Sequence, residues 1–223
     1  MTLPILLFAA GLGTRMQHLV NDRPKPLIEV GGKPLIDHAL AFTDEVGSCT
    51  RVVNLHFKGQ MIRDHLAGTG IVFSDETDEL LETGGGLRHA IPLLGGSPVI
   101  TMNTDAVWRG PNPVTTALQA WDDRMEALLL TVPRAQVSGH LGKGDFFRAD
   151  DGRLRRGPGE IYTGVQIIRT DTLKAIPDNV FSLNAVWDQM AKRGGLYGVS
   201  YAGQWCDVGQ PSSIPLAEAM LNV

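Results

Sequence analysis

Short, almost continuously apolar runs alternate along the chain with segments in which apolar residues recur at helical spacing. The run at residues 3–10 ends in a glycine-rich turn, which is typical of a parallel strand that is covered on both faces and lies near the centre of a sheet. The segment from Leu35 has helical periodicity and is followed by a strand-like run. The strands expected are 3–10, 51–55, 71–74, 98–102, 127–132, 162–168 and 196–201, and the helices are 35–46, 60–66, 83–94, 114–121, 183–193 and one that begins at 211.

Alternating strands and helices with short connections predict an α/β fold. We expect a Rossmann-like three-layer sandwich, in which helices cover both faces of a mixed, mostly parallel sheet. Two short strand-like segments that flank Asp150-Asp151-Gly152 predict a hairpin. No internal repeat, linker or low-complexity tract is visible, so we expect a single domain of residues 1–223. Ligands of such a sheet gather at the carboxyl ends of its strands.

The charge balance argues against two classes of partner. A formal net charge of −4 and an isoelectric point near 5.8 provide no basic surface for nucleic acid or for anionic lipid. The apolar run at 3–10 is far shorter than the ~20 residues of a membrane span, and no basic residue precedes it, because the first is Arg15. Cys49 and Cys206 have neither metal-ligand spacing nor disulfide density. We therefore expect a cytoplasmic protein without nucleic-acid or membrane partners.

The first candidate for chemistry is the loop at residues 9–16, Ala-Ala-Gly-Leu-Gly-Thr-Arg-Met, directly after the first strand. Its glycines allow backbone N–H groups to approach phosphate oxygens, and Arg15 can offer a bidentate fork to the same anion. Gly-x-Gly alone is also compatible with an ordinary strand-to-helix turn. Met16 stands where a dinucleotide-binding fingerprint requires its third glycine, and the Gly-Lys-Ser/Thr of a P-loop is missing.

A second candidate follows at residues 23–27, Arg-Pro-Lys-Pro-Leu. The two prolines stiffen the backbone around Lys25 and limit the positions that its ammonium can reach. Taken alone, such a segment is more often a solvated turn. Beside a glycine loop, we interpret it as a second phosphate-binding element.

Together these segments resemble the amino-terminal signature of the sugar nucleotidylyltransferases, and the match continues through Gly-Lys-Pro-Leu-Ile at 32–36. Within that family the chain is similar to the small bacterial N-acetylmuramate-1-phosphate uridylyltransferases at 81–86, 144–146, 162–165 and 205–209. The resemblance implies an enzyme of cell-wall recycling that takes a nucleoside triphosphate, with UTP favoured, and a sugar 1-phosphate. It also implies a Mg²⁺ cofactor held by Asp105 and Asp207. Two carboxylates suffice, because Mg²⁺ usually combines a few carboxylates with phosphates and water.

The other roles that the resemblance implies fall into three groups. The catalytic residues are Arg15, Lys25 and Asp105. The nucleotide-binding residues are Ala10, Gly11, Gly13, Thr14, Arg15, Lys25, Glu82, Gly84, Gly85 and Asn103. The sugar-binding residues are Asn103, Asp145, Glu160, Thr163 and Gly164.

The chain departs from the family pattern at two places. Thr104 stands before the metal-binding aspartate, where many relatives have glycine, and the second lysine of larger relatives is missing. Lys143 is the nearest candidate for the role of that lysine. Lys143 and three arginines between the two aspartates can meet a carboxylate on the sugar, or they can form a solvated basic hairpin; the arginines are Arg153, Arg155 and Arg156. The six histidines lack metal-ligand spacing, so we expect ordinary surface or packing residues.

The implied reaction is in-line attack by a phosphate oxygen of the sugar 1-phosphate on the α-phosphorus, with pyrophosphate as leaving group. A phosphate with a second pKa of ~6 is already ionised near neutral pH, so no general base is required.

Three alternative functions were considered beside this reaction. A guanylyl- or cytidylyltransferase for another sugar or alcohol phosphate stays open, because sequence does not reveal the loop geometry that selects the base. Loss of either metal-binding aspartate would favour a non-catalytic nucleotide-binding module, but Asp105 and Asp207 are both present. A nicotinamide-dependent dehydrogenase needs an acidic residue at the end of the second strand, where Asn54-Leu55-His56 stands. The oligomeric state cannot be predicted.

Overall fold

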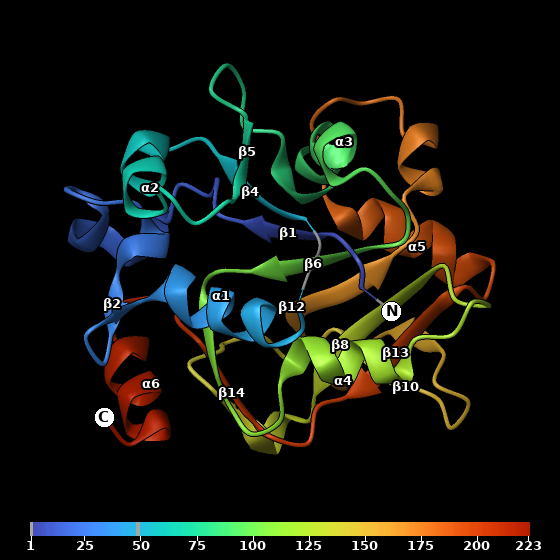
Figure 1. The fold of residues 1–223 in the computed structure, drawn as a ribbon. Helices are drawn as coiled ribbons and strands as arrows, with labels where there is room; N and C mark the ends of the chain where they lie inside the picture. The colour runs from blue at the N-terminus through green and yellow to red at the C-terminus, as the bar shows by residue number, and fades with distance from the viewer. Residues whose placement is uncertain (1, 48–49) are drawn as a thin grey trace.

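The computed structural model describes residues 2–47 and 50–223, and within them a seven-stranded sheet runs through the middle of the molecule (Figure 1). β12 is antiparallel to both of its neighbours, whereas the other neighbouring strands pair in parallel. The sheet is therefore mixed and mostly parallel, as predicted. In order across the sheet the strands are β13 (Leu196–Ser200), β8 (Ala127–Val132), β12 (Ile161–Ile168), β6 (Val99–Asn103), β1 (Ile5–Phe8), β4 (Arg51–Leu55) and β5 (Val72–Asp75).

The continuous apolar character of β1 follows from burial on both faces of the sheet. Side chains alternate along the strand, so Leu6 packs into one apolar cluster while Ile5 and Leu7 pack into another. Helices cover each cluster, and the predicted three-layer sandwich is confirmed. Those on the Ile5 face are α1 (Leu35–Glu45), α2 (Gly59–His65) and α4 (Pro113–Ala120), and those on the Leu6 face are α3 (Glu82–Leu94) and α5 (Leu183–Lys192).

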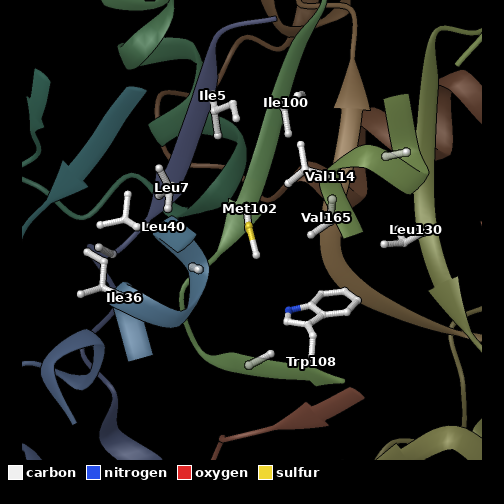
Figure 2. Close-up of a cluster of buried hydrophobic side chains, with 14 of the residues drawn as sticks. Ile5, Leu7, Ile36, Leu40, Ile100, Met102, Trp108, Val114, Leu130 and Val165 are labelled. Carbon is white, nitrogen blue, oxygen red and sulfur yellow. The ribbon is translucent and has the colours of Figure 1, made fainter. Parts of the chain in front are cut away.

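The cluster on the Ile5 face shows how the helical periodicity of the sequence becomes packing (Figure 2). Ile36 and Leu40, one helical turn apart on α1, point to the same side of the helix and meet the sheet. Val114 of α4 reaches the same cluster further along the sheet. Burial of these apolar side chains against the sheet holds α1 and α4 in place.

Capping residues set where two of the helices begin. The side chain of Asn112 accepts hydrogen bonds from the backbone N–H groups of Val114 and Thr115, at 2.9 and 3.1 Å. Ser182 does the same for α5, accepting from the N–H of Asn184 at 3.2 Å. Such side chains satisfy N–H groups that have no partner within the helix.

A three-stranded sheet directly after β6 was not predicted. It consists of β7 (Ala106–Arg109), β14 (Gln204–Asp207) and β9 (Val137–Ser138), with β14 in the middle. β14 is antiparallel to β7, with Asp207 opposite Ala106, and parallel to β9. A third apolar cluster joins this sheet to the carboxy-terminal helix α6 (Ser213–Leu221). The end of the chain thereby packs beside the loop that follows β1.

The remaining elements are short. The predicted hairpin around Asp150-Asp151-Gly152 is confirmed, with β10 and β11 paired antiparallel. These elements are β2 (Glu29–Val30), β3 (Lys33–Pro34), β10 (Phe146–Arg148), β11 (Leu154–Arg156) and the 3₁₀ helices η1 (Thr14–Val20), η2 (Lys25–Leu27), η3 (Arg134–Gln136) and η4 (Asp171–Ala175).

Two further expectations concern cysteines and membranes. Cys206 is buried and unpaired, and burial raises the pKa of its thiol to about 12, whereas Cys49 lies outside the described residues. A search of the described helices finds none with both the length and the apolar character that a bilayer span needs.

Candidate active site

A cavity of about 230 Å³ lies where β1 and β6 end. This is the edge at which a parallel sheet collects its ligands. Several residues expected to bind the nucleotide line it, together with the expected metal ligand Asp105: Ala10, Gly11, Lys25, Glu82 and Asn103. The structure therefore brings together segments that are far apart in the sequence.

The glycine loop is held in place by the neighbouring strand. The backbone N–H groups of Ala9 and Ala10 donate to Asn54 Oδ1 at 2.7 and 3.3 Å, and Asn54 Nδ2 donates to Glu76 Oε1 at 2.7 Å. Both Asn54 and Glu76 are buried and line the cavity. Neither residue had been expected in the site, although each stands close to the carboxyl end of a predicted strand. This position was the signal that could have identified them.

Gly13 is required for two separate reasons. Its φ of +63° lies in the left-handed region, and a Cβ there would be 2.9 Å from Cβ of Lys25. The glycine loop and the Lys25 segment consequently touch. Thr14 and Arg15 begin η1 directly behind this contact.

The two aspartates are brought side by side by the small sheet. Asp105 ends the segment that leaves β6, and its carbonyl oxygen accepts from the N–H of Val208 at 2.9 Å. Asp207 is opposite Ala106 in the β14–β7 ladder, so both carboxylates project from the same end of this sheet. The unpredicted sheet is thus what unites the predicted pair.

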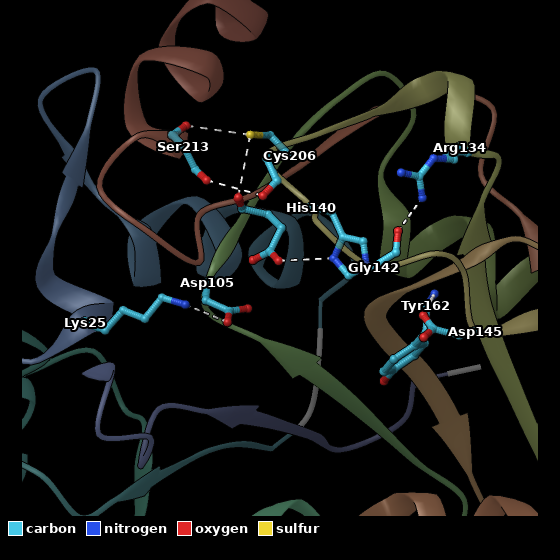
Figure 3. A network of polar contacts seen from close by, with 11 residues as sticks. Lys25, Asp105, Arg134, His140, Gly142, Asp145, Tyr162, Cys206 and Ser213 are labelled. Carbon is cyan, nitrogen blue, oxygen red and sulfur yellow. Dashed lines mark hydrogen bonds and ion pairs between the residues drawn. The ribbon is translucent and has the colours of Figure 1, made fainter. Parts of the chain in front are cut away.

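Lys25 and His140 each approach one of these carboxylates (Figure 3), and Arg15 lies nearby. Lys25 Nζ lies 2.8 Å from Asp105 Oδ2, and His140 Nδ1 lies 3.3 Å from Asp207 Oδ2. A Cβ on Gly209 would be 3.1 Å from Asp207 Oδ1 and 3.2 Å from an Arg15 guanidinium nitrogen. Arg15 therefore approaches Asp207 across Gly209. Most of the histidines had been expected to be ordinary surface or packing residues, and the structure places His140 in contact with Asp207.

The pKa values of the two aspartates shift in opposite directions. Burial would raise the pKa of Asp105, but the charge and hydrogen bond of Lys25, with the charge of Arg15, lower it below its ordinary value. Burial and the neighbouring charge of Asp105 raise the pKa of Asp207, although Lys25, His140 and Arg15 oppose this effect. The positive charge of the neighbouring side chains therefore does not fully offset the repulsion between the two carboxylates when both are ionised. Hard oxygen donors in this arrangement fit a divalent cation such as Mg²⁺.

Thr104 does not interfere with this arrangement. Its side chain is buried, and Oγ1 donates to the carbonyl oxygen of Phe8 at 2.7 Å. The hydroxyl thereby ties the end of β6 to the end of β1. Replacement of glycine by threonine at this position adds a contact between the strands that frame the cavity.

A second cavity, of about 240 Å³, adjoins the first and shares Phe8, Thr83 and Asn103 with it. Asp145 lines the second cavity, and its Oδ2 accepts from the N–H of Tyr162 at 2.9 Å. Of the residues expected to bind the sugar, Asn103 and Asp145 are therefore at the cavity wall. Asn103 lies between the two cavities, which suits its expected place near both substrates.

The other three residues expected to bind the sugar, Glu160, Thr163 and Gly164, do not line the second cavity. Thr163 Oγ1 donates to the carbonyl oxygen of Leu130 at 2.7 Å, and Glu160 is hydrogen-bonded to Thr131 and paired with Arg148. Neither residue lines the cavity. Gly164 acts indirectly, because a Cβ there would lie 2.7 Å from Cβ of Asn103.

The glycines at the start of α3 are also placed differently from the expectation. The N–H groups of Gly84 and Gly85 donate to the carbonyl oxygen of Phe181 at 2.8 and 3.1 Å. Neither glycine lines the first cavity, where Glu82 and Thr83 stand instead. Glu82 has a φ of +59°, which is uncommon for a residue with a side chain and indicates a backbone held under strain beside the cavity. Lys143, the expected substitute for a missing lysine, is exposed and lines neither of these two cavities.

Comparison with known proteins gives this site its chemical context. The model of the MobA-like NTP transferase domain matches residues 5–206. The chain belongs to this family. The predicted membership of the sugar nucleotidylyltransferases, and the prediction that the chain is an enzyme of this kind, are thereby confirmed.

Two curated relatives and one solved structure illustrate the similarity. The N-acetylmuramate alpha-1-phosphate uridylyltransferase of Caulobacter vibrioides is 40% identical, over 97% of this chain and 96% of its own length. The protein of the same name from Neisseria meningitidis serogroup B is 32% identical, over 96% of each chain. The inositol-1-phosphate CTP transferase of T. maritima shares the fold, with a TM-score of 0.79 at 14% identity, over 99% of this chain and 95% of that one.

Proposed function

We propose that this protein transfers a uridylyl group from UTP to N-acetylmuramate 1-phosphate and releases pyrophosphate, an activation step that returns a cell-wall amino sugar to use. The observation that carries the proposal is the pair of adjoining cavities, the first of which is lined by Lys25 and Asp105. A nucleotide in the first cavity and a sugar phosphate in the second would meet at Asn103. The names of the two bacterial relatives support this choice of substrates.

In the proposed reaction, a phosphate oxygen of the sugar 1-phosphate forms a bond to the α-phosphorus of UTP. The bond from that phosphorus to the bridging oxygen breaks, and pyrophosphate leaves with the electron pair. Lys25 and Arg15 supply positive charge to two anions that repel each other, and the loop at 10–13 can offer backbone N–H groups. The chain has to orient its substrates and neutralise charge, because the attacking phosphate is already ionised.

The residues that would hold Mg²⁺ are Asp105 and Asp207. Their adjacency and their opposed pKa shifts are what support a cation there. When bound, the ion would supply positive charge to the phosphate oxygens of the substrates. The ammonium of Lys25 lies 2.8 Å from the Asp105 carboxylate. A cation bound by Asp105 would take the place of this ammonium, and Lys25 would then be available to a phosphate.

A matrix of substrates tests the proposal. The purified protein would be supplied with each of the five common nucleoside triphosphates and with N-acetylmuramate, N-acetylglucosamine, glucose or mannose 1-phosphate, and pyrophosphate release would be measured. The highest kcat/KM is expected for UTP with N-acetylmuramate 1-phosphate, and chelation of divalent cations should abolish release. A higher kcat/KM with GTP or CTP, or with a neutral hexose phosphate, would overturn the substrate assignment. Its cytoplasmic location stays a prediction.

A further inference from the structure

The second cavity contains a cation that the proposed reaction does not use. Arg156, at the end of β11, is the one basic residue that lines this cavity in the described part of the chain. Three other basic residues had been considered with it. None of these three lines the cavity: Lys143 is exposed, Arg153 pairs with Asp151, and Arg155 lies over the ring of Phe147. The structure therefore separates Arg156 from its neighbours.

The guanidinium of Arg156 is held in a fixed orientation. Nε donates to Asp188 Oδ1 at 2.8 Å, and one Nη donates to Asn184 Oδ1 at 2.8 Å. Its plane lies over the ring of Phe146, with 4.6 Å from the central carbon to the ring centroid, and near Trp187 at 5.7 Å. The other Nη has no hydrogen-bond partner among the residues that the structure describes, and the side chain is 40% exposed. Three hydrogen bonds to Asp188 and Asn184, one of them to the Asn184 carbonyl oxygen at 3.3 Å, and two aromatic rings thus restrain a group that keeps one Nη free.

The environment of this donor suits an anion that is not the reacting phosphate. Ser182 and Asn184, at the amino-terminal end of α5, line the same cavity, and this end of a helix carries partial positive charge. Asp145 lines the cavity too, and its carboxylate suits sugar hydroxyls as donors. A sugar with hydroxyls on one side and a carboxylate on the other matches this distribution. A neutral sugar would offer the free donors of Arg156 only hydroxyl oxygens, which accept weaker hydrogen bonds than a carboxylate does.

We infer that Arg156 is the residue that selects an acidic sugar, by donating to the carboxylate of the lactyl ether of N-acetylmuramate 1-phosphate. The inference rests on the proposed function, because it presupposes a sugar 1-phosphate in the second cavity. The free Nη can donate to that carboxylate, and a hydrogen bond between two charged groups is stronger than one to a neutral acceptor, so it favours a sugar that carries the acid. N-acetylglucosamine 1-phosphate, which differs only by the absence of this ether, is the natural comparison substrate.

The alternative is that Arg156 only ties β11 to α5 through Asp188 and Asn184. A structural role of this kind affects both sugars equally, whereas a selecting role affects the acidic sugar alone. The ratio of the kcat/KM values for the two sugar phosphates separates the two roles, since any general damage to the fold or to the cavity cancels in it.

The experiment compares Arg156→Gln and Arg156→Lys with Arg155→Gln, a matched change on the same hairpin. Arg156→Gln should lower the kcat/KM ratio of the acidic to the neutral sugar by about 10- to 100-fold, the value of one charge-assisted hydrogen bond. Arg156→Lys should restore part of the ratio, and Arg155→Gln should leave it unchanged. Wild-type protein supplied with a substrate whose carboxylate has been converted to an amide should reproduce the ratio of Arg156→Gln with the acid. Binding of each sugar 1-phosphate, measured calorimetrically without triphosphate, should show the same selective loss.

Two outcomes overturn different statements. If the wild type prefers the acidic sugar and Arg156→Gln lowers both kcat/KM values equally, Arg156 is a structural tether and the inference is wrong while the proposed function stands. If the wild type itself does not prefer the acidic sugar, the proposed function is wrong.

Discussion

Removal of the ammonium of Lys25 tests the arrangement of charge in the first cavity most directly. Its Nζ lies 2.8 Å from Asp105 Oδ2, and its side chain is only 10% exposed, so Lys25→Met removes a positioned cation with little change in volume. Loss of one preorganised donor costs about 3–4 kcal/mol of transition-state stabilisation, which corresponds to a roughly 100- to 1,000-fold fall in kcat. The assay is pyrophosphate release, with thermal denaturation in parallel.

The same substitution has a signed effect on stability. Lys25 contributes most among the groups that lower the pKa of Asp105, so Lys25→Met raises that pKa toward its unfolded value. A carboxyl with a lowered folded pKa stabilises the fold above its unfolded pKa, and this stability disappears as pH falls through the folded value. The stability gap between wild type and variant should therefore be present at neutral pH and should close in acid.

Lys33→Met is the matched control, because Lys33 is an exposed lysine on β3 outside both cavities. It should melt and turn over like the wild type. Retention of more than a tenth of the wild-type kcat by a folded Lys25→Met variant would refute the phosphate-binding role. A loss of activity that simply follows unfolding would refute it as well.

Three further predictions concern the metal pair, a glycine and a histidine. Asp105→Asn and Asp207→Asn should each remove most turnover while the fold persists, and full activity at limiting Mg²⁺ would contradict the metal assignment. Gly209→Ala should lower kcat/KM, because the added Cβ would lie 3.1 Å from the Asp207 carboxylate and 3.2 Å from the Arg15 guanidinium. Gly96→Ala is the control, since a Cβ there meets nothing within 4 Å, and kcat/KM should not change. Equal effects of the two substitutions would exclude this contact as the cause. Burial lowers the pKa of His38 against an opposing backbone hydrogen bond, so stability should fall as pH drops below ~6.5. His38→Gln should remove part of this loss of stability in acid, by less than about 1.4 kcal/mol for each unit by which the pKa is shifted. A variant whose melting temperature depends on pH as that of the wild type does would contradict this prediction.

The large sheet was predictable because its strands are buried on both faces and therefore read as apolar runs. β4 was predicted with its observed ends, Arg51 and Leu55, while β1 was predicted too long. Ala9 and Ala10 are apolar, but their N–H groups bond to the side chain of Asn54 and not to a strand. Composition alone does not distinguish these two cases.

The small sheet could not be predicted from periodicity. β9 has only two residues, and β7 and β14 form this sheet by pairing with segments far apart in the sequence, which a local pattern does not reveal. The contact between His140 and Asp207 depends on this sheet, because β9 pairs with β14 just before the loop that carries His140. A lone histidine in a glycine-rich loop carries no signal of such a contact.

The differences between the expected sugar-binding residues and the residues that line the second cavity have a geometric origin. Motif similarity indicated a segment of β12 but not the direction of each side chain. Tyr162 faces the second cavity, whereas Thr163, the next residue of the strand, bonds to a neighbouring strand and faces away. Arg156, which does line the cavity, lies on a different strand and outside the motif.

The common wall of the two cavities bears on inhibitor design. Because Phe8, Thr83 and Asn103 border both spaces, a nucleoside fragment and a sugar fragment bound there would be separated by side chains alone, and a short spacer would join them. Linking two weak fragments makes the second binding event intramolecular, with an effective concentration in the millimolar range for a short flexible spacer. A bivalent molecule of this kind would exclude both substrates at once, so raising the concentration of either substrate alone would not displace it completely.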